Sequence, residues 1–159
     1  MGKGGDLKLL DFTMFRGRHE YGIDSKGRLA IPAKFREILV AQFDERLIVT
    51  HFDQCLWAYP VSLWQELEKK IGQLPQFLEE VKALQRVFVS AASECPLDKQ
   101  GRILLPPTLR DYAGLSKDVV LVGMTQRIEI WSKSRWKKVF GDSQKKLESL
   151  QEKLAELGL

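Results

Sequence analysis

Two short segments of the chain repeat one arrangement of residues, in which an aspartate is followed three positions later by a glycine and then by an arginine. The arrangement occurs as Asp24, Gly27 and Arg28 and again as Asp98, Gly101 and Arg102. An aspartate at the start of a turn accepts a backbone N–H two residues on, and a glycine adopts the positive φ that closes the turn. We therefore interpret both aspartates and both glycines as turn-forming residues.

The arginine that follows each turn has two alternative roles. An arginine side chain can bond the O6 and N7 atoms of guanine in a major groove, which predicts Arg28 and Arg102 as nucleic-acid contacts. Alternatively, each arginine pairs with the aspartate of its own turn, Asp24 or Asp98, and only makes the turn more rigid. Because a carboxylate repels phosphate, we favour the turn-forming role for the aspartates. For the arginines we favour contact with DNA.

Basic side chains concentrate around the first turn. The net charge of the chain is +4, and residues 14–36 alone hold six basic and two acidic side chains. Each phosphate that a protein neutralises releases counterions, so a local excess of positive charge is typical of a surface that binds nucleic acid. A solvated face without a partner is the alternative. Residues 88–110 hold three basic and two acidic side chains, so we expect the first copy to supply most of the attraction for phosphate. The candidate DNA-binding residues are Arg16, Arg18, Lys26, Arg28, Lys34, Arg36 and Arg102.

A shift of 74 positions aligns the two turns and the sequence around them. Of the 23 pairs from Met14 and Phe88 onward, six are identical, and most of the hydrophobic positions also match. Each copy predicts a strand, a turn, a second strand, a short helix and two further strands. In the first copy the strands at 19–23 and 28–31 flank four residues that contain glycine, which favours a hairpin. Pro32 and its counterpart Pro106 then begin the short helix.

Helical patterns lie between and after the two copies. They predict helices at 62–71 and at about 76–87, and another that begins near Ser134. Beyond Gly141 four leucines recur at heptad spacing, namely Leu147, Leu150, Leu154 and Leu157. Two heptads are too few for a stable isolated coiled coil, so this leucine stripe must pack either on its own domain or on a neighbouring protomer. The predicted divisions are an N-terminal extension at 1–13, with disorder expected, a first domain at 18–65, a helical linker at 66–93, a second domain at 94–137 and a C-terminal helix at 138–159.

The remaining features exclude several classes of protein. No apolar run approaches the roughly 18 to 20 residues of a membrane helix, and the first residues lack the apolar core of a secretory signal, so a cytoplasmic protein is expected. Cys55 and Cys95 form neither a disulfide framework nor a Cys-x-x-Cys pair, and we interpret them as buried thiols. His51 and Cys55 lack the further ligands of a zinc site, and no catalytic motif is present. We therefore expect no metal, no cofactor and no enzyme activity.

The doubled turn, its flanking hydrophobic positions and the following proline and arginine resemble the AbrB/SpoVT-type DNA-binding domain. Two copies in one chain, with Met14-Phe15-Arg16-Gly17 ahead of the first, resemble the MraZ family. The resemblance implies an α+β fold that is mainly β, in which two pseudo-symmetric swapped-hairpin units form a β-barrel with flanking helices. It also implies a ring-like homo-oligomer.

The same resemblance implies a nucleoid-associated repressor of the division and cell wall gene cluster that includes its own gene. The partner would be double-stranded DNA with repeated promoter boxes, and the DNA-contacting arginine of the family corresponds to Arg28 and Arg102. The competing hypothesis is a non-enzymatic, self-assembling protein-interaction ring whose basic face is incidental.

Overall fold

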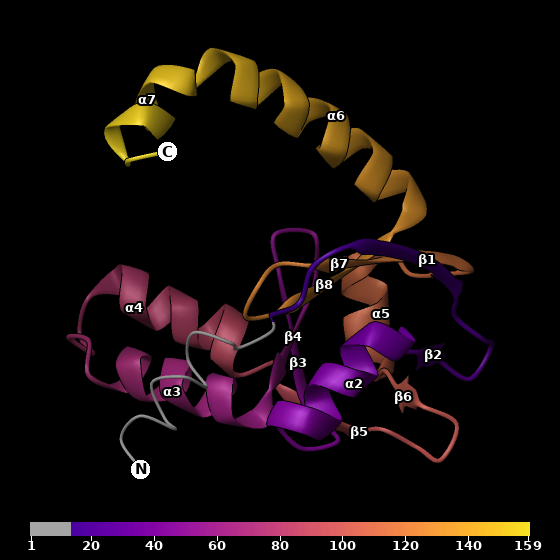
Figure 1. Ribbon diagram of the computed structural model, residues 1–159. Helices are drawn as coiled ribbons and strands as arrows, with labels where there is room; N and C mark the ends of the chain where they lie inside the picture. The colour runs from indigo at the N-terminus through magenta and orange to yellow at the C-terminus, as the bar shows by residue number, and fades with distance from the viewer. Residues whose placement is uncertain (1–13) are drawn as a thin grey trace, which may run out of the picture.

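The computed structural model describes residues 14–159, and the predicted extension at 1–13 lies outside the described residues. In the body of the molecule helices surround the strands, and a long C-terminal helix leads away from it (Figure 1). The elements in chain order are β1 (Arg18–Gly22), β2 (Arg28–Ala30), α2 (Ala33–Gln42), β3 (Arg46–Phe52), β4 (Cys55–Pro60), α3 (Val61–Gly72), α4 (Glu79–Leu84), a π-helical turn η1 (Gln85–Val89), β5 (Ser93–Pro96), β6 (Arg102–Leu104), α5 (Pro107–Ala113), β7 (Asp118–Gly123), β8 (Ile128–Ser132), α6 (Lys133–Ser149) and α7 (Gln151–Glu156).

The two repeats exchange strands. One antiparallel sheet has the order β1-β7-β8-β4-β3-β5, and a separate ribbon pairs β2 with β6. The first strand of each repeat therefore pairs with the other repeat: β1 lies against β7, and β5 lies against β3. The repeats also meet at the centre of the sheet, where β4 pairs with β8. Neither repeat contains all the partners that its own strands need.

This exchange corrects two expectations. The strands on either side of the first turn form no hairpin ladder, because the only bridge between them joins Ile23 to Leu29 while β1 and β2 take their partners from the second repeat. Within the described residues the larger sheet ends at β1 on one side and at β5 on the other, so the fold is α+β with antiparallel sheets and not a closed barrel.

Side chains alternate between the two faces of the larger sheet. On β7, Val119 and Leu121 join the main core, to which α2 and α5 also contribute, whereas Val120 and Val122 join a second cluster that packs against α6. A third cluster, centred on Phe88, lies between the sheet and α3. Both faces are therefore covered, as the near-continuous apolar run of β7 requires.

The C-terminal helices leave the body of the molecule. The start of α6 packs on β7 and β8 through Trp136 and Val139, but none of its residues is buried. The helix continues through Gly141 and is interrupted at Leu150, after which α7 follows. Of the leucine stripe, Leu147, Leu150 and Leu157 are exposed. These three leucines are therefore not buried against their own domain. No helix among residues 14–159 combines the length and the apolar character that crossing a membrane requires.

Candidate nucleic-acid interface

The first turn is closed by hydrogen bonds to the side-chain carboxylate and to the backbone carbonyl of Asp24. Its Oδ1 atom accepts the backbone N–H groups of Lys26, at 3.0 Å, and Arg28, at 2.8 Å. The backbone N–H of Gly27 donates to the Asp24 carbonyl at 3.0 Å, and Gly27 has a φ of +87°. These bonds favour the ionised carboxylate, and the N–H of Arg28 is the main cause of the lowered pKa of Asp24. The turn is thus specified by its own residues.

The second turn repeats this geometry. Oδ1 of Asp98 accepts the backbone N–H groups of Gln100, at 2.8 Å, and Arg102, at 2.9 Å. Gly101 donates to the Asp98 carbonyl at 3.0 Å and has a φ of +76°. The N–H of Arg102 is again the main cause of the lowered pKa of Asp98. The two repeats therefore build equal turns.

Each turn also forms the ion pair that the sequence offered as an alternative. Nε of Arg28 donates to Oδ2 of Asp24 at 2.6 Å, and Nε of Arg102 donates to Oδ2 of Asp98 at 3.0 Å. The arginine side chains keep 36% and 29% of their surface exposed. The pairing is made through the nitrogen nearest the chain, so it orients each guanidinium without burying it.

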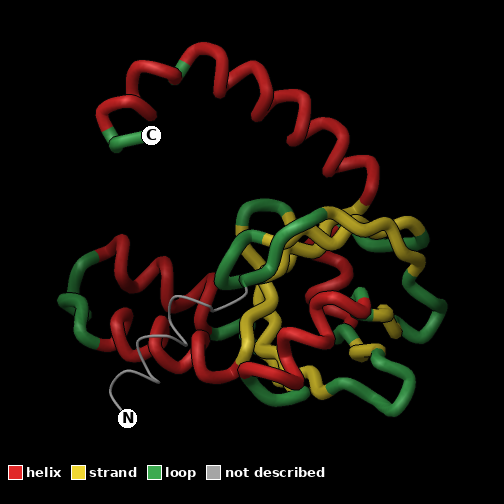
Figure 2. Tube along the Cα trace, viewed as in Figure 1, coloured by secondary structure: helices red, strands yellow, loops and turns green. Residues whose placement is uncertain are grey.

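The ribbon β2–β6 brings the two arginines onto one face. Its register pairs Arg28 with Leu104 and Ala30 with Arg102. Between them lie Leu29 and Ile103, which are fully buried in the main core, so the four other side chains face away from it. Backbone bonds from Ile31 to Gly101 and from Leu105 to Gly27, each 2.9 Å, continue the pairing up to the turns. The loops that contain the turns lie on the side of the molecule that carries β2 and β6 (Figure 2).

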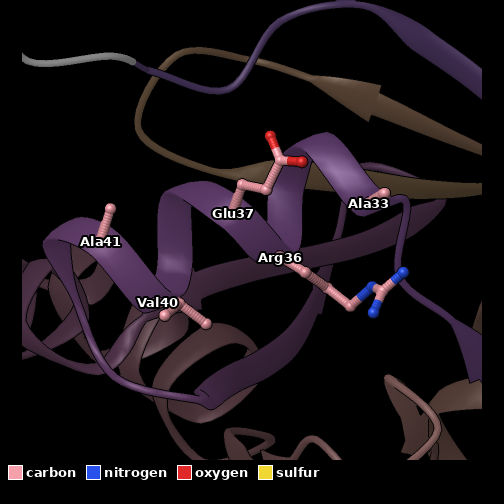
Figure 3. A pocket seen from close by; sticks show the side chains of 5 residues that line it. All are labelled: Ala33, Arg36, Glu37, Val40 and Ala41. Atoms are coloured by element: carbon pink, nitrogen blue, oxygen red, sulfur yellow. The ribbon is translucent and has the colours of Figure 1, made fainter.

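Two further arginines hold the turns across the repeats. Nε of Arg110, in the second repeat, donates to the Leu105 carbonyl at 3.1 Å and packs on Gly27 of the first repeat. In the same way, Nε of Arg36 donates to the Ile31 carbonyl at 3.0 Å and packs on Gly101. Figure 3 shows Arg36 extending from α2 away from Glu37, along the hollow that both residues line. Each turn is therefore held by an arginine of the other repeat.

The structure brings some of the predicted basic residues together and separates others. Lys26 is exposed in the first turn. Lys34 is exposed at the start of α2, which follows Ile31 and so begins beside the turn of the second repeat. Arg18 lies on the larger sheet with its guanidinium 4.8 Å from the ring centre of Phe140 in α6.

Arg16 follows Phe15, which bridges to Thr125 in the loop between β7 and β8, and it is exposed there. Arg16 and Arg18 are thus associated with the larger sheet and not with the ribbon. One residue missing from the predicted set is Lys99, which is exposed in the second turn. The shift of 74 aligns Lys99 with the uncharged Ser25, so a search for basic residues matched between the repeats misses it. Its position directly after Asp98, inside the second turn, is the signal that identifies it.

The thiol and imidazole groups take part in packing. Cys55 and Cys95 are buried, as predicted. The ring of His51 lies 4.1 Å from that of Tyr112, and its Nε2 is 2.9 Å from the Val87 carbonyl oxygen. Across residues 14–159, no group of three or more His, Cys, Asp or Glu side chains is arranged to hold a metal ion.

Comparison with known proteins agrees with the doubled architecture. A family model of the MraZ protein, whose description includes the term "antitoxin-like", matches residues 14–87 and again residues 88–157. The two matches begin 74 positions apart, so the predicted repeat is confirmed.

Several curated relatives align with nearly the whole chain. A protein of Desulfitobacterium hafniense is 48% identical over 147 residues, one of Moorella thermoacetica is 46% identical over 146, and one of Acetivibrio thermocellus is 44% identical over 146. Each alignment covers 92% of this chain and 100% of the relative. All three are named as the transcriptional regulator MraZ, and none is named as an enzyme. Two matches to the family model and identities of this size show that the chain belongs to the MraZ family.

Proposed function

We propose that the chain is a sequence-specific transcriptional regulator that binds duplex DNA through the ribbon β2–β6 and the turn at each of its ends. The observation that carries the proposal is the outer face of the ribbon, on which two arginines, each oriented by an aspartate, lie on neighbouring strands. The names of the relatives support a role in transcription. From the family resemblance we infer a cytoplasmic, nucleoid-associated repressor of the division and cell wall gene cluster that includes its own gene.

The dimensions of the ribbon suit a major groove. A groove about 12 Å wide admits a two-stranded ribbon. Arg28 and Arg102 are diagonal neighbours across the two strands, because Ala30 stands opposite Arg102. Such neighbours have Cα atoms about 7–8 Å apart, which corresponds to roughly two base-pair steps of about 3.4 Å. The two arginines are therefore rooted about two base-pair steps apart on one face, within reach of two bases of one short box.

The ion pairs suggest different roles for the arginines and the lysines. Each arginine holds its charge beside a carboxylate, so an Asp–Arg pair has little net charge with which to attract phosphate. The guanidinium is nevertheless fixed in direction, which suits the bidentate recognition of guanine. Lys26, Lys34 and Lys99 are exposed around the turns and suit contact with phosphates. We therefore assign sequence recognition to the arginines and most of the salt-dependent affinity to the lysines.

A salt titration of DNA binding tests this assignment. The probe is the duplex that lies upstream of the chain's own coding sequence, compared with a shuffled duplex of the same composition. Arg28→Lys keeps the charge but loses the guanidinium fork, so we expect it to discriminate less between the two duplexes, with an unchanged salt slope, while Arg102 maintains part of the preference. Lys26→Ala is expected to lower affinity for both duplexes and to reduce the slope by about 0.9.

The two variants also separate the competing functions. Equal binding of both duplexes by the wild-type protein would show that recognition is not sequence-specific. If the wild-type protein binds neither duplex, the basic face is incidental and the protein-interaction ring becomes the better hypothesis. A loss of discrimination in Lys26→Ala but not in Arg28→Lys would reverse the assigned roles.

We further infer that the protein works as a ring-like homo-oligomer on repeated promoter boxes. Support comes from the leucine stripe, since Leu147 is 56% exposed and Leu157 77% exposed on helices that leave the body of the molecule. Exposed apolar side chains that recur along a helix are typical of an association surface. Weak contacts from several protomers then add through effective concentration when the boxes are spaced to match.

A further inference from the structure

The outer face of the ribbon carries one large apolar side chain, Leu104. It is 59% exposed and stands directly opposite Arg28. The residue at the equivalent position of the first repeat is Ala30, which stands opposite Arg102. The two halves of the ribbon thus share a backbone and an arginine but differ beside it, with leucine in one half and alanine in the other.

The position of Leu104 gives it no part in the core. On the same strand Ile103 is fully buried, and the alternation of a strand turns Leu104 to the opposite side. A single exposed leucine is ordinary on a protein surface. This one lies on a four-residue face with two arginines and between two turns that carry exposed lysines. The partner that fits is therefore a polyanion that also presents an apolar group.

We propose that Leu104 contacts the C5-methyl group of a thymine in the major groove, and that this contact gives the pseudo-symmetric ribbon a direction on DNA. The proposal rests on the DNA-binding function proposed above. The thymine methyl is the apolar group that base pairs present in the major groove. Directly opposite residues of an antiparallel pair have Cβ atoms about 4.5–5.5 Å apart. The thymine is therefore expected within one or two base pairs of the base that Arg28 contacts.

Ala30 makes the opposite half of the ribbon different. Its side chain is a single methyl group, so the half around Arg102 presents a smaller and shorter apolar side chain than the half around Arg28. A box that matches the ribbon is therefore asymmetric, even though the two turns are alike.

Replacing thymidine by deoxyuridine in the upstream duplex tests the contact, because it removes the methyl groups and keeps the hydrogen-bonding pattern. We expect the wild-type protein to bind the deoxyuridine duplex about fourfold more weakly for each methyl that is contacted. Leu104→Ala should bind both duplexes alike, with an affinity close to that of the wild type for the deoxyuridine duplex. Arg28 is unchanged in this variant, so preference for the upstream over the shuffled sequence should persist in part.

Phe77→Ala is the matched control. Phe77 is 92% exposed in the segment between α3 and α4, which lies across the molecule from the ribbon (Figure 1), so this variant should keep the wild-type ratio of the two affinities. The proposal fails if the wild type binds both duplexes equally, or if Leu104→Ala keeps the wild-type ratio. A change of sedimentation coefficient in Leu104→Ala would assign Leu104 to a contact between protomers and also overturn it. If the wild type prefers upstream to shuffled DNA in each of these cases, the proposed function stands while this inference falls.

Discussion

Gly27→Ala is the substitution for which the structure makes the sharpest stability prediction. A Cβ atom at Gly27 would lie 2.6 Å from Nε of Arg110 and 3.0 Å from the Leu105 carbonyl oxygen, at a φ of +87°. A side chain in this left-handed region costs about 1–2 kcal/mol. Moving Arg110 aside breaks its hydrogen bond to Leu105, and hydrogen bonds to charged groups contribute about 1.5–3 kcal/mol.

Together these effects predict a loss of about 3 kcal/mol in the free energy of unfolding, at the lower end of the range because Arg110 is only half-buried. For a chain of this length that corresponds to a fall in Tm of roughly 6–12 °C. The assay is urea unfolding followed by tryptophan fluorescence. Gly72→Ala is the control, since a Cβ there meets nothing within 4 Å and the change is expected to stay within about 1 kcal/mol.

A double-mutant cycle identifies the cause of the loss. In Arg110→Ala the hydrogen bond is already absent, so adding Gly27→Ala should cost only the backbone strain of about 1–2 kcal/mol. Equal costs in the two backgrounds would show that the contact across the repeats does not hold the turn. An unfolding midpoint for Gly27→Ala that matches Gly72→Ala would refute the reasoning as a whole.

Three further predictions concern the turns, the thiols and the tail. The pKa values of Asp24 and Asp98 are lowered in the folded protein, so their carboxylates stabilise the fold above about pH 4, and this contribution is lost as pH falls through the lowered pKa values. Urea midpoints measured between pH 5 and pH 2 should therefore fall more steeply for the wild type than for the double variant Asp24→Asn, Asp98→Asn. Burial raises the pKa of Cys95 to about 11 and that of Cys55 further above its ordinary value, so iodoacetamide should label neither thiol in the native protein at neutral pH and both in concentrated urea; labelling of the native protein would contradict their burial. The double variant Leu147→Asp, Leu150→Asp should sediment as a smaller species than Glu148→Gln, and identical sedimentation would remove the leucine stripe from the assembly surface.

The parts of the site that the sequence could predict are those whose causes are local. Asp24 and Gly27 define a turn through bonds to residues two to four positions away, so their spacing alone indicates it. The burial of β7 on both faces is likewise visible as a run of apolar residues. The 74-residue repeat follows from identities along the chain and needs no knowledge of contacts.

The parts that the sequence could not predict depend on which strand meets which. The first turn predicts a hairpin, but β1 forms its ladder with β7, far along the chain in the second repeat. The sequence identifies Arg36 only as a basic residue. Its packing on Gly101, a residue of the other repeat, depends on the exchange of strands between the repeats.

Counting charge by repeat is misleading for the same reason. Lys34 belongs to the first repeat but begins a helix beside the second turn. The positive charge that the sequence concentrates in one copy is therefore shared between both ends of the ribbon. Lys99 adds a further positive charge at the second turn, in the repeat that holds fewer basic residues.

The exchange of strands between repeats also orders events during synthesis. Arg18 pairs with Val122, and Arg46 pairs with Pro96, so two strands of the first repeat wait for partners that the ribosome has not yet made. Until then the nascent chain exposes unpaired strand edges, which are the places where chains aggregate. Contacts so distant along the chain also slow folding. The first repeat therefore cannot complete its fold during translation, and the chain reaches its native state only after the second repeat has emerged.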